Sequence, residues 1–344
     1  MPVLQPDGVR MGAAGVGALR GRQRVAPRPA TAAPRAAPAV PGAAPAVSRA
    51  APAVPRAAPA VPRAAPAVPM PSTPSAISER DFQRICRFIH EQAGIALSPN
   101  KKTLVAGRLF RRLEVVGAAD YGEYLDHVEA SGGEAEFQVA IDLLTTNETY
   151  FWREARHFEL AERLARDAAA ARRGFSVWSA ASSTGEEAYT LAMVFEGIRV
   201  AGVPLEWQIM GSDISSRVLA AARRGLYPMD RAAQLPQPLL RRFCRRGTGP
   251  HAGYLLVDRS LRERLEFRPI NLIETLPDLP PFDMIFLRNV MIYFDNATKT
   301  AVVNRLLGRL KPGGTLCVGL AETLNGIVSG LASAGPGAYR KAAA

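Results

Sequence analysis

The chain has 344 residues, of which 48% are hydrophobic and 22% are charged, enough to form one or two folded domains. It contains no run of about 18 or more apolar residues, so we expect no transmembrane helix. Cys86, Cys244 and Cys317 lie far apart in no metal-ligand spacing, and so sparse a set is typical of a reducing compartment. We therefore expect a cytoplasmic protein with no metal site and no membrane insertion.

The net charge of +12 is unevenly distributed along the chain. Residues 1–76 contain nine Arg, no Lys and one acidic residue, a net charge of +8, whereas the remainder has 34 basic and 30 acidic residues. A strongly basic protein often binds nucleic acid, but here most of the excess belongs to one segment. We therefore do not expect nucleic acid as a partner. A protein that acts on nucleic acid is the first alternative.

The first 76 residues are predicted to be a disordered tail rich in Pro, Ala and Arg. Residues 1–75 hold 16 of the 28 prolines, and the unit Ala-Ala-Pro-Ala-Val recurs every seven residues from Ala36 onwards. Proline removes amide donors and blocks helix formation. The segment also has too few large apolar side chains to offset the entropy lost on ordering.

Residues 77–145 predict a small all-helical domain. The first helix is expected to start after Ser78 and to stop at Gly94, because apolar residues recur between them at helical spacing. Further helices are expected after Pro99, over 121–130 and over 134–144. The helix after Pro99 has an apolar side of Leu104, Val105, Leu109, Phe110 and Leu113, and a basic side of Lys101, Lys102, Arg108, Arg111 and Arg112.

After about residue 155, short apolar strands alternate with helices, which is typical of a doubly wound, mostly parallel α/β sheet. The predicted strands are 175–179, 207–212, 282–287 and 315–319, and the predicted helices are 185–200, 215–224 and 297–310. The alternation breaks between 229 and 269, where 254–257 and 265–268 look like short strands. We therefore predict an α/β domain over 146–344 with an insertion at about 229–269.

A loop of small residues, Ser179-Ala-Ala-Ser-Ser-Thr-Gly-Glu-Glu187, follows the first predicted strand. Parallel sheets bind ligands at the carboxyl ends of their strands, but this loop lacks the Gly-x-Gly-x-x-Gly fingerprint of dinucleotide sites. Glu186 and Glu187 at the helix start would repel a pyrophosphate, whereas Asp213 ends the next strand, where an acid commonly binds nucleoside hydroxyls. The combination indicates a nucleoside without phosphates, such as S-adenosylmethionine. The alternative is that these acids only cap a helix and end a strand.

Two further runs, 145–154 and 282–295, combine polar and aromatic residues. The first lies at the junction of the two predicted domains. The second is a buried strand that leads into Arg288 and Asn289, a pair that is costly at the end of a core strand unless it is used or well bonded. Taken singly, each run is either part of a site or a satisfied structural network.

Taken together, six ordered motifs resemble the chemotaxis receptor methyltransferases (the CheR-type family) over roughly residues 77–340. They are Asn147-Glu-Thr-Tyr-Phe-Trp-Arg153, Ser182-Ser-Thr-Gly-Glu-Glu187, Ser212-Asp-Ile214, Asn271-Leu272, Phe286-Leu-Arg-Asn-Val-Met-Ile-Tyr-Phe294 and Leu310-Lys-Pro-Gly-Gly314. The resemblance implies a helical N-terminal domain on a Rossmann-like S-adenosylmethionine domain, with a small antiparallel β subdomain inserted.

The resemblance also implies a cofactor site. In it, Arg153 would pair with the methionine carboxylate of S-adenosylmethionine, while Asp213 and one acid of the Glu186–Glu187 pair would bind the sugar and amino groups. The sequence does not decide between the two glutamates, and we favour Glu187. The full set of expected cofactor residues is Asn147, Thr149, Arg153, Glu186, Glu187, Asp213, Asn271, Leu272, Arg288 and Asn289, of which Asn271 and Leu272 would border the adenine.

The implied reaction is methyl transfer to the γ-carboxylates of glutamates in methyl-accepting chemotaxis receptors. A carboxylate is already an anion at pH 7, so the enzyme must align the reactants rather than supply a general base. Tyr293 and Arg156 are the candidates to hold the incoming carboxylate. The basic side of the helix after Pro99 is a candidate for docking on an acidic helical receptor, and the other interpretation is a solvated face. We expect a monomer.

Two alternatives remain open at this point. One is a methyltransferase that acts on nucleic acid, although the Asn/Asp-Pro-Pro-aromatic signature common in such amino-methylating enzymes is absent. The other is a sensor that binds S-adenosylmethionine without catalysis, against which the intact Arg153, Asp213 and Asn289 argue.

Overall fold

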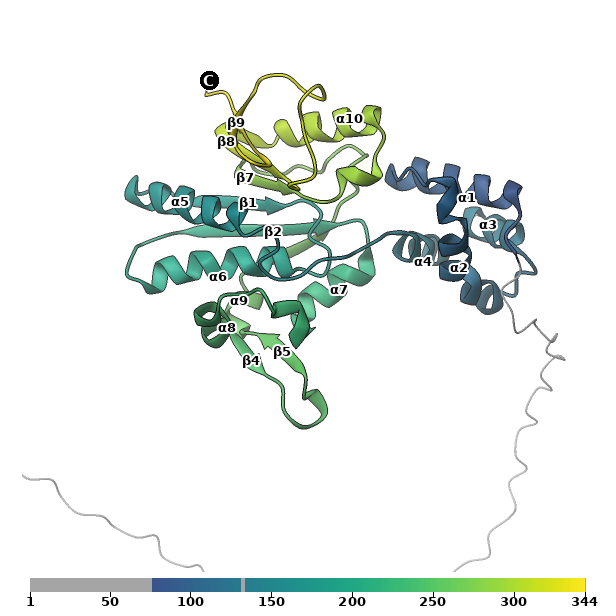
Figure 1. Cartoon of the computed structure of the whole chain (residues 1–344), viewed down its shortest axis with the longest axis horizontal. Coiled ribbons are helices and arrows are strands. Elements are labelled where there is room, and N and C mark those ends of the chain that lie inside the picture. Colours follow the sequence, from purple (N-terminus) through teal and green to yellow (C-terminus); the bar gives the residue numbers. More distant parts are fainter. Residues whose placement is uncertain (1–75, 131–133, 344) are drawn as a thin grey trace, which may run out of the picture. The chain divides into compact units, whose positions relative to one another are not determined.

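The computed structural model describes residues 76–130 and 134–343 (Figure 1). All but the last residue of the predicted tail therefore lies outside the described residues. The described part begins with a group of helices and continues into two sheets with their covering helices. The predicted fold class, a helical domain before a mostly parallel α/β domain with a small antiparallel insertion, is confirmed.

The helical domain begins with α1, Glu79–Ala93. Ser78 caps it, because its Oγ accepts a hydrogen bond from the Asp81 amide at 3.0 Å. Gly94 ends it in the left-handed conformation, with φ at 72°. Both predicted ends of this helix are confirmed. The domain continues with η1 (Pro99–Lys101), α2 (Lys102–Val116), α3 (Tyr121–Glu129) and α4 (Glu134–Leu144).

The core of this domain lies between the four helices. Val105, Leu109 and Leu113 form the buried stripe of α2 and pack in one cluster with α1, α3 and α4. Leu104 was expected on this side but is 42% exposed. The expectation was wrong because the stripe repeats every four residues, and Leu104 lies about 100° round the helix from its neighbour in that stripe.

The main sheet has seven strands in the order β6-β2-β1-β7-β8-β10-β9. The first five are parallel to one another, and β10 and β9 add antiparallel strands at one edge. The strands are β1 (Phe175–Ser179), β2 (Trp207–Asp213), β6 (Glu266–Pro269), β7 (Phe282–Leu287), β8 (Leu310–Val318), β9 (Leu331–Gly335) and β10 (Ala338–Lys341).

Helices cover both faces of this sheet (Figure 1). Successive side chains of a strand point to opposite faces, so Val177 packs in the cluster that contains α5 and α6, whereas Trp178 packs in the cluster that contains α10. The helices are α5 (Arg156–Ala170), α6 (Glu186–Val200), α7 (Ser216–Arg224) and α10 (Asn296–Leu307), with η4 (Met291–Tyr293) before α10.

The insertion forms a second, three-stranded antiparallel sheet in the order β3-β5-β4. It consists of β3 (Leu226–Pro228), η2 (Met229–Ala232), α8 (Gln237–Phe243), β4 (Cys244–Arg246), η3 (Gly249–His251), β5 (Tyr254–Val257) and α9 (Arg259–Arg262). The prediction had included the strand at 265–268 in this insertion. That strand, β6, instead pairs in parallel with β2 at the edge of the main sheet.

The boundary between α10 and β8 also differs from the prediction. The helix ends at Leu307, and the Lys311-Pro-Gly-Gly314 segment, expected as a helix stop before a strand, lies inside β8. The pairing of β7 with β8 shifts in register here, and Gly313 has a φ of 72°. Glycine permits the irregularity that lets Pro312 remain within a strand.

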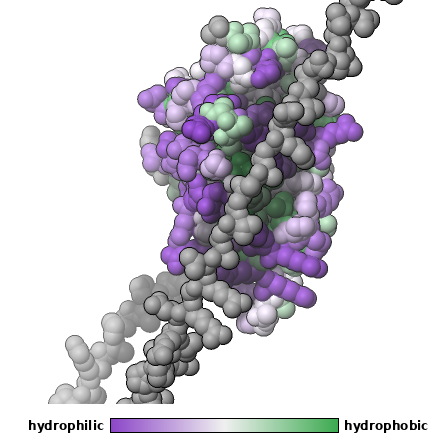
Figure 2. Space-filling view, turned by 90° about the vertical axis from the view of Figure 1, so that its left-hand side faces the viewer, coloured by the Kyte–Doolittle hydropathy of each residue, from purple (hydrophilic) through white to green (hydrophobic). Residues whose placement is uncertain are grey.

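Within residues 76–130 and 134–343, no helix is both long and apolar enough to cross a membrane. In the coloured part of the face shown in Figure 2, hydrophilic side chains surround small groups of hydrophobic ones. Small exposed apolar groups of this kind are normal on a protein surface.

Candidate active site

A pocket lies at the carboxyl ends of β1, β2 and β7, where parallel sheets bind ligands. It holds about 970 Å³ of empty space, including its open mouth. Its walls come from the 145–153 segment, the loop after β1, the start of α6, the end of β2, the 270–273 segment, the 288–294 turn, and Ala93 and Ile95 of the helical domain. Segments far apart in the sequence therefore share one cavity.

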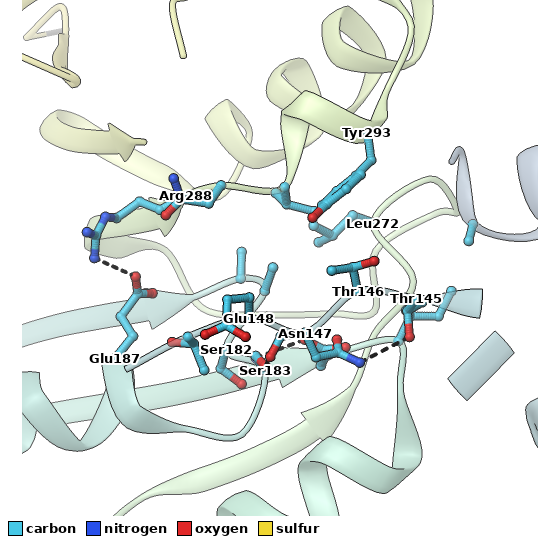
Figure 3. A pocket seen from close by; sticks show the side chains of 18 of the residues that line it. Thr145, Thr146, Asn147, Glu148, Ser182, Ser183, Glu187, Leu272, Arg288 and Tyr293 are labelled. Atoms are coloured by element: carbon cyan, nitrogen blue, oxygen red, sulfur yellow. Dashed lines mark hydrogen bonds and ion pairs between the residues drawn. The ribbon is translucent and has the colours of Figure 1, made fainter. Parts of the chain in front are cut away.

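The pocket brings together ten of the twelve predicted site residues. Figure 3 shows Arg288 and Tyr293 on one side and Asn147, Ser182 and Ser183 on the other. The ten that line the pocket are Asn147, Thr149, Arg153, Glu187, Asp213, Asn271, Leu272, Arg288, Asn289 and Tyr293. Glu186 and Arg156 do not line it.

The positions of Glu186 and Arg156 follow from the helices that carry them. Glu186 is 1% exposed, and its Oε2 accepts a hydrogen bond from Thr184 Oγ1 at 2.6 Å. Neighbouring residues project about 100° apart on a helix, so only Glu187 faces the cavity. Arg156 begins α5 and is exposed in a separate hollow beside Pro336. We therefore assign Arg156 no contact with the reacting groups.

Asp213 ties the loop after β1 to the end of β2. Its Oδ2 accepts a hydrogen bond from the Ser183 amide at 2.9 Å, and its Oδ1 accepts one from the Ser215 amide at 3.0 Å. Burial raises the pKa of Asp213, while these amide donors oppose the rise. The carboxylate lines the cavity and keeps further lone pairs for a ligand hydroxyl.

The loop after β1 brings its backbone close to the cavity. Gly185 has a φ of 94°, and a Cβ on it would lie 2.8 Å from the Ala222 side chain. Ser183 also has a positive φ, 49°, and its Oγ donates to the Asn147 carbonyl at 3.2 Å. Glycine is therefore required at position 185, where both the positive φ and the close approach to Ala222 exclude a larger residue.

A buried ion cluster forms the wall at Arg288. Its side chain is 2% exposed and lies between two carboxylates: Nη1 donates to Glu187 at 2.8 Å, and Nη2 donates to Glu154 at 2.9 Å. Glu187 also accepts a hydrogen bond from Ser179 Oγ at 2.7 Å. Because protein groups occupy most of its N–H donors, Arg288 orients Glu187 rather than presenting a free cation to a ligand.

The two carboxylates of this cluster respond differently to their surroundings. Burial raises the pKa of Glu187, although Arg288 and Ser179 oppose the rise. Burial also acts to raise the pKa of Glu154, but the charge and hydrogen bonds of Arg288 outweigh it, and the pKa falls below its ordinary value. Two acids thus share one guanidinium, and the wall favours a cationic ligand.

Arg153 is the cation of the pocket that keeps free donors. Its Nη1 donates to the Glu148 carbonyl at 2.9 Å, and its guanidinium lies 5.8 Å from the centre of the Tyr150 ring. No carboxylate within residues 76–130 and 134–343 forms an ion pair with it. It is therefore available for an anionic group of a ligand.

Tyr293 is held at the cavity by the helical domain. Its carbonyl accepts a hydrogen bond from the Ala96 amide at 2.8 Å, and Ile95 forms an antiparallel bridge with Phe294. Arg108 of α2 fixes the segment beside it, because it donates to the Leu144 and Thr145 carbonyls at 2.9 and 3.1 Å. The helical domain therefore builds part of this site.

The sequence reasoning missed two residues of this network, Glu154 and Arg108. Glu154 ends the polar-aromatic run at 145–154, and a buried Arg at the end of a core strand requires an acidic partner, so the signal for it was present. Arg108 was grouped with exposed bases, and no local pattern indicates that its partners lie 36 residues away.

Comparison with known proteins places these features in a family. The CheR methyltransferase all-alpha domain matches residues 80–145, and the CheR methyltransferase SAM binding domain matches residues 147–334. The chemotaxis protein methyltransferases of Salmonella typhimurium and Escherichia coli are each 42% identical to the chain. These alignments cover 74% and 73% of the chain and 87% and 86% of the relatives. Chemotaxis protein methyltransferase 2 of Pseudomonas aeruginosa is 41% identical over 73% of the chain and 92% of that protein.

The pocket fits the cofactor of this family, S-adenosylmethionine. Asp213 offers acceptors for hydroxyl groups, Arg153 offers the remaining donors of its guanidinium, and Glu187 offers a carboxylate to a cationic group. Leu272 adds an apolar surface for a base. From its sequence similarity, its two matched domains and this pocket, the chain belongs to the CheR family of S-adenosylmethionine-dependent methyltransferases.

Proposed function

We propose that this chain transfers the methyl group of S-adenosylmethionine to the γ-carboxylate of glutamates in methyl-accepting chemotaxis receptors, and so forms glutamyl methyl esters. One observation carries the proposal. A single pocket joins Glu187, Asp213 and Tyr293 to Arg153, which pairs with no carboxylate of the described residues, in a chain whose relatives are named chemotaxis protein methyltransferases. S-adenosylmethionine supplies the reactive methyl group on its sulfonium.

Several residues of the pocket have a role in binding this cofactor. Arg153 binds the methionine carboxylate through charge-assisted hydrogen bonds. Glu187, oriented by Arg288 and Ser179, accepts from the ammonium group, and Asp213 accepts from the ribose. Asn147, Thr149 and Asn289 complete the polar wall, and Asn271 and Leu272 border the adenine.

The acceptor side needs alignment rather than proton transfer. A glutamate carboxylate is ionised at pH 7, so its oxygen attacks the methyl carbon directly once it lies in line with the bond that breaks. Holding the two groups in that geometry supplies the catalysis. Tyr293 lies on the cavity wall and is the group we assign to hold the incoming carboxylate, by donating its phenolic hydrogen.

Receptor docking is assigned to a smaller basic surface than the sequence suggested. Arg112 forms an ion pair with the buried Glu136, and Lys102 pairs with Glu79 at 3.0 Å. Lys101 and Arg111 are exposed and pair with no acid among the described residues. We propose that these two bases bind an acidic helix of the receptor. We also propose that the enzyme binds the receptor as a monomer.

The proposal is tested with purified full-length chain, tritiated S-adenosylmethionine and receptor-containing membranes. The wild type is expected to label the receptor. Glu187→Gln is expected to weaken cofactor binding by tenfold or more, because it removes the charge that faces the ammonium group. Glu186→Gln is the matched control, since that neighbouring carboxylate lies outside the pocket. Equal cofactor affinity in the two variants would remove Glu187 from the site.

A further inference from the structure

The turn after β7 carries two pocket residues, Asn289 and Tyr293, on an unusual backbone. Asn289 has a φ of 57°, in the left-handed region that non-glycine residues rarely adopt, although Asn adopts it more readily than most. The short helix η4 that follows begins at Met291, and the preceding Val290 has no side-chain group that caps it. Met291 anchors this helix in the core at 2% exposure, whereas Ile292 is 57% exposed and is not held by burial. A backbone of this kind persists only where its surroundings fix it.

A carboxylate from a distant loop fixes this turn. Glu322 Oε2 accepts hydrogen bonds from the amides of Gly319 and Asn289 at 2.7 and 2.8 Å, and its Oε1 accepts one from the Ile292 amide at 3.2 Å. One carboxylate thus joins the end of β8 to both ends of the turn. Hydrogen bonds to an ionised acceptor are about twice as strong as neutral ones.

Gly319 provides an independent sign that this arrangement is closely fitted. A Cβ at this position would lie 2.5 Å from Asn289 Nδ2 and 2.9 Å from Glu322 Oε2. Any larger residue would therefore push Glu322 and Asn289 apart. The bond from the Asn289 side chain to Glu154, at 3.3 Å, connects the same turn to the ion cluster at Arg288.

We infer that Glu322 is a positioning residue for the methyl-acceptor side of the pocket. It acts through the backbone of 289–292 to hold Tyr293 where that side chain meets the incoming carboxylate. This inference rests on the proposed function. Glu322 is not among the residues that line the cavity, so it affects the acceptor through Tyr293 rather than by contact.

The test compares Glu322→Ala, Glu322→Gln and Gly319→Ala in the full chain. Asp258→Ala is the matched control, because Asp258 also accepts from a backbone amide, that of Ser260, but caps α9 in the insertion. At saturating cofactor and receptor, kcat is expected to fall roughly tenfold to a hundredfold in Glu322→Ala and Gly319→Ala, as small misplacements do. Glu322→Gln keeps one acceptor and is expected to retain more activity. Because Asn289 also belongs to the cofactor wall, the Kd for S-adenosylmethionine is expected to rise, but by a smaller factor than the fall in kcat.

A second measurement reads the position of Tyr293 without any receptor. In the chain labelled with 3-fluorotyrosine, the fluorine resonance of Tyr293 is the one that Tyr293→Phe removes. It is expected to shift or broaden in Glu322→Ala and Gly319→Ala but not in Asp258→Ala. An unmoved resonance, or an unchanged kcat in folded Glu322→Ala, would overturn the inference. A wild type that transfers no methyl group would instead contradict the proposed function, and the resonance would still decide the role of Glu322.

Discussion

Replacing Arg288 by Met tests the buried ion cluster most severely. Arg288 is 2% exposed, and its partners Glu154 and Glu187 are 15% and 13% exposed. The substitution preserves an apolar stem but leaves two carboxylates without their cation. Removing one partner of a buried pair costs about 3–5 kcal/mol, so the free energy of unfolding is expected to fall by about that amount near neutral pH.

The loss is expected to depend on pH, with a sign fixed by the two glutamates. Burial raises the pKa of Glu187, and without Arg288 it must rise further, so the native state holds a proton that the unfolded state has released. The stability that such a protonated group contributes to the protein is lost as pH rises through the native pKa of the group. Arg288 lowers the pKa of Glu154 in the native state. This shift stabilises the wild type at pH values above the pKa that Glu154 has in the unfolded chain, and the variant lacks that stabilisation.

Both effects make the variant recover relative to the wild type as pH falls. Urea unfolding of the two proteins at about pH 7.5 and about pH 5 measures the difference between their free energies of unfolding. For each proton that only the variant takes up, this difference should shrink by about 1.4 kcal/mol per pH unit. The double variant with Glu154→Gln removes one uncompensated charge and should regain stability at the higher pH. A loss below about 1 kcal/mol, or one equal at both pH values, would refute the account of this cluster.

Three further predictions concern the proposed binding surfaces. Asp213→Asn should lower the affinity for S-adenosylmethionine by about one to two powers of ten, a loss of about 1–3 kcal/mol, and calorimetry on the folded variant checks it. Arg153→Met should weaken S-adenosylmethionine more than it weakens a cofactor analogue that lacks the methionine carboxylate, and equal losses would contradict the assigned pair. Reversing Lys101 and Arg111 to Glu should slow receptor methylation at low salt and remove its salt dependence, with unchanged cofactor affinity. Reversing Arg163, an exposed base of α5 away from the helical domain, to Glu should do neither.

The elements that the sequence predicted well are those set by local pattern. The strand Phe175–Ser179 was predicted with its observed ends, because a five-residue run with Phe, Val and Trp that starts after a glycine favours a strand. Asp213 was placed at a strand end for the same reason. The α10–β8 boundary was missed because Pro-Gly-Gly normally ends an element, whereas here it forms an irregular stretch of β8.

The site residues divide in the same way. Glu186 and Glu187 differ only in the direction that each faces on α6, which the sequence alone does not reveal. Arg108 acts on a segment that lies 36 or more residues away in the sequence. Glu322 has one local contact, with Gly319, and its other partners lie 30 or more residues away. Such contacts depend on the tertiary fold, and no periodicity in the chain encodes them.

The chemistry of the product tests the central claim most directly. After incubation of the full chain with tritiated S-adenosylmethionine and receptor-containing membranes, the labelled receptor is digested, the modified residue is located by mass spectrometry, and the label is treated with mild base. We predict label on glutamate side chains that base releases as methanol, because a glutamyl methyl ester hydrolyses readily. Label that resists base, or that resides on nucleic acid or on other side chains, would contradict the assignment of this chain as a receptor glutamate methyltransferase.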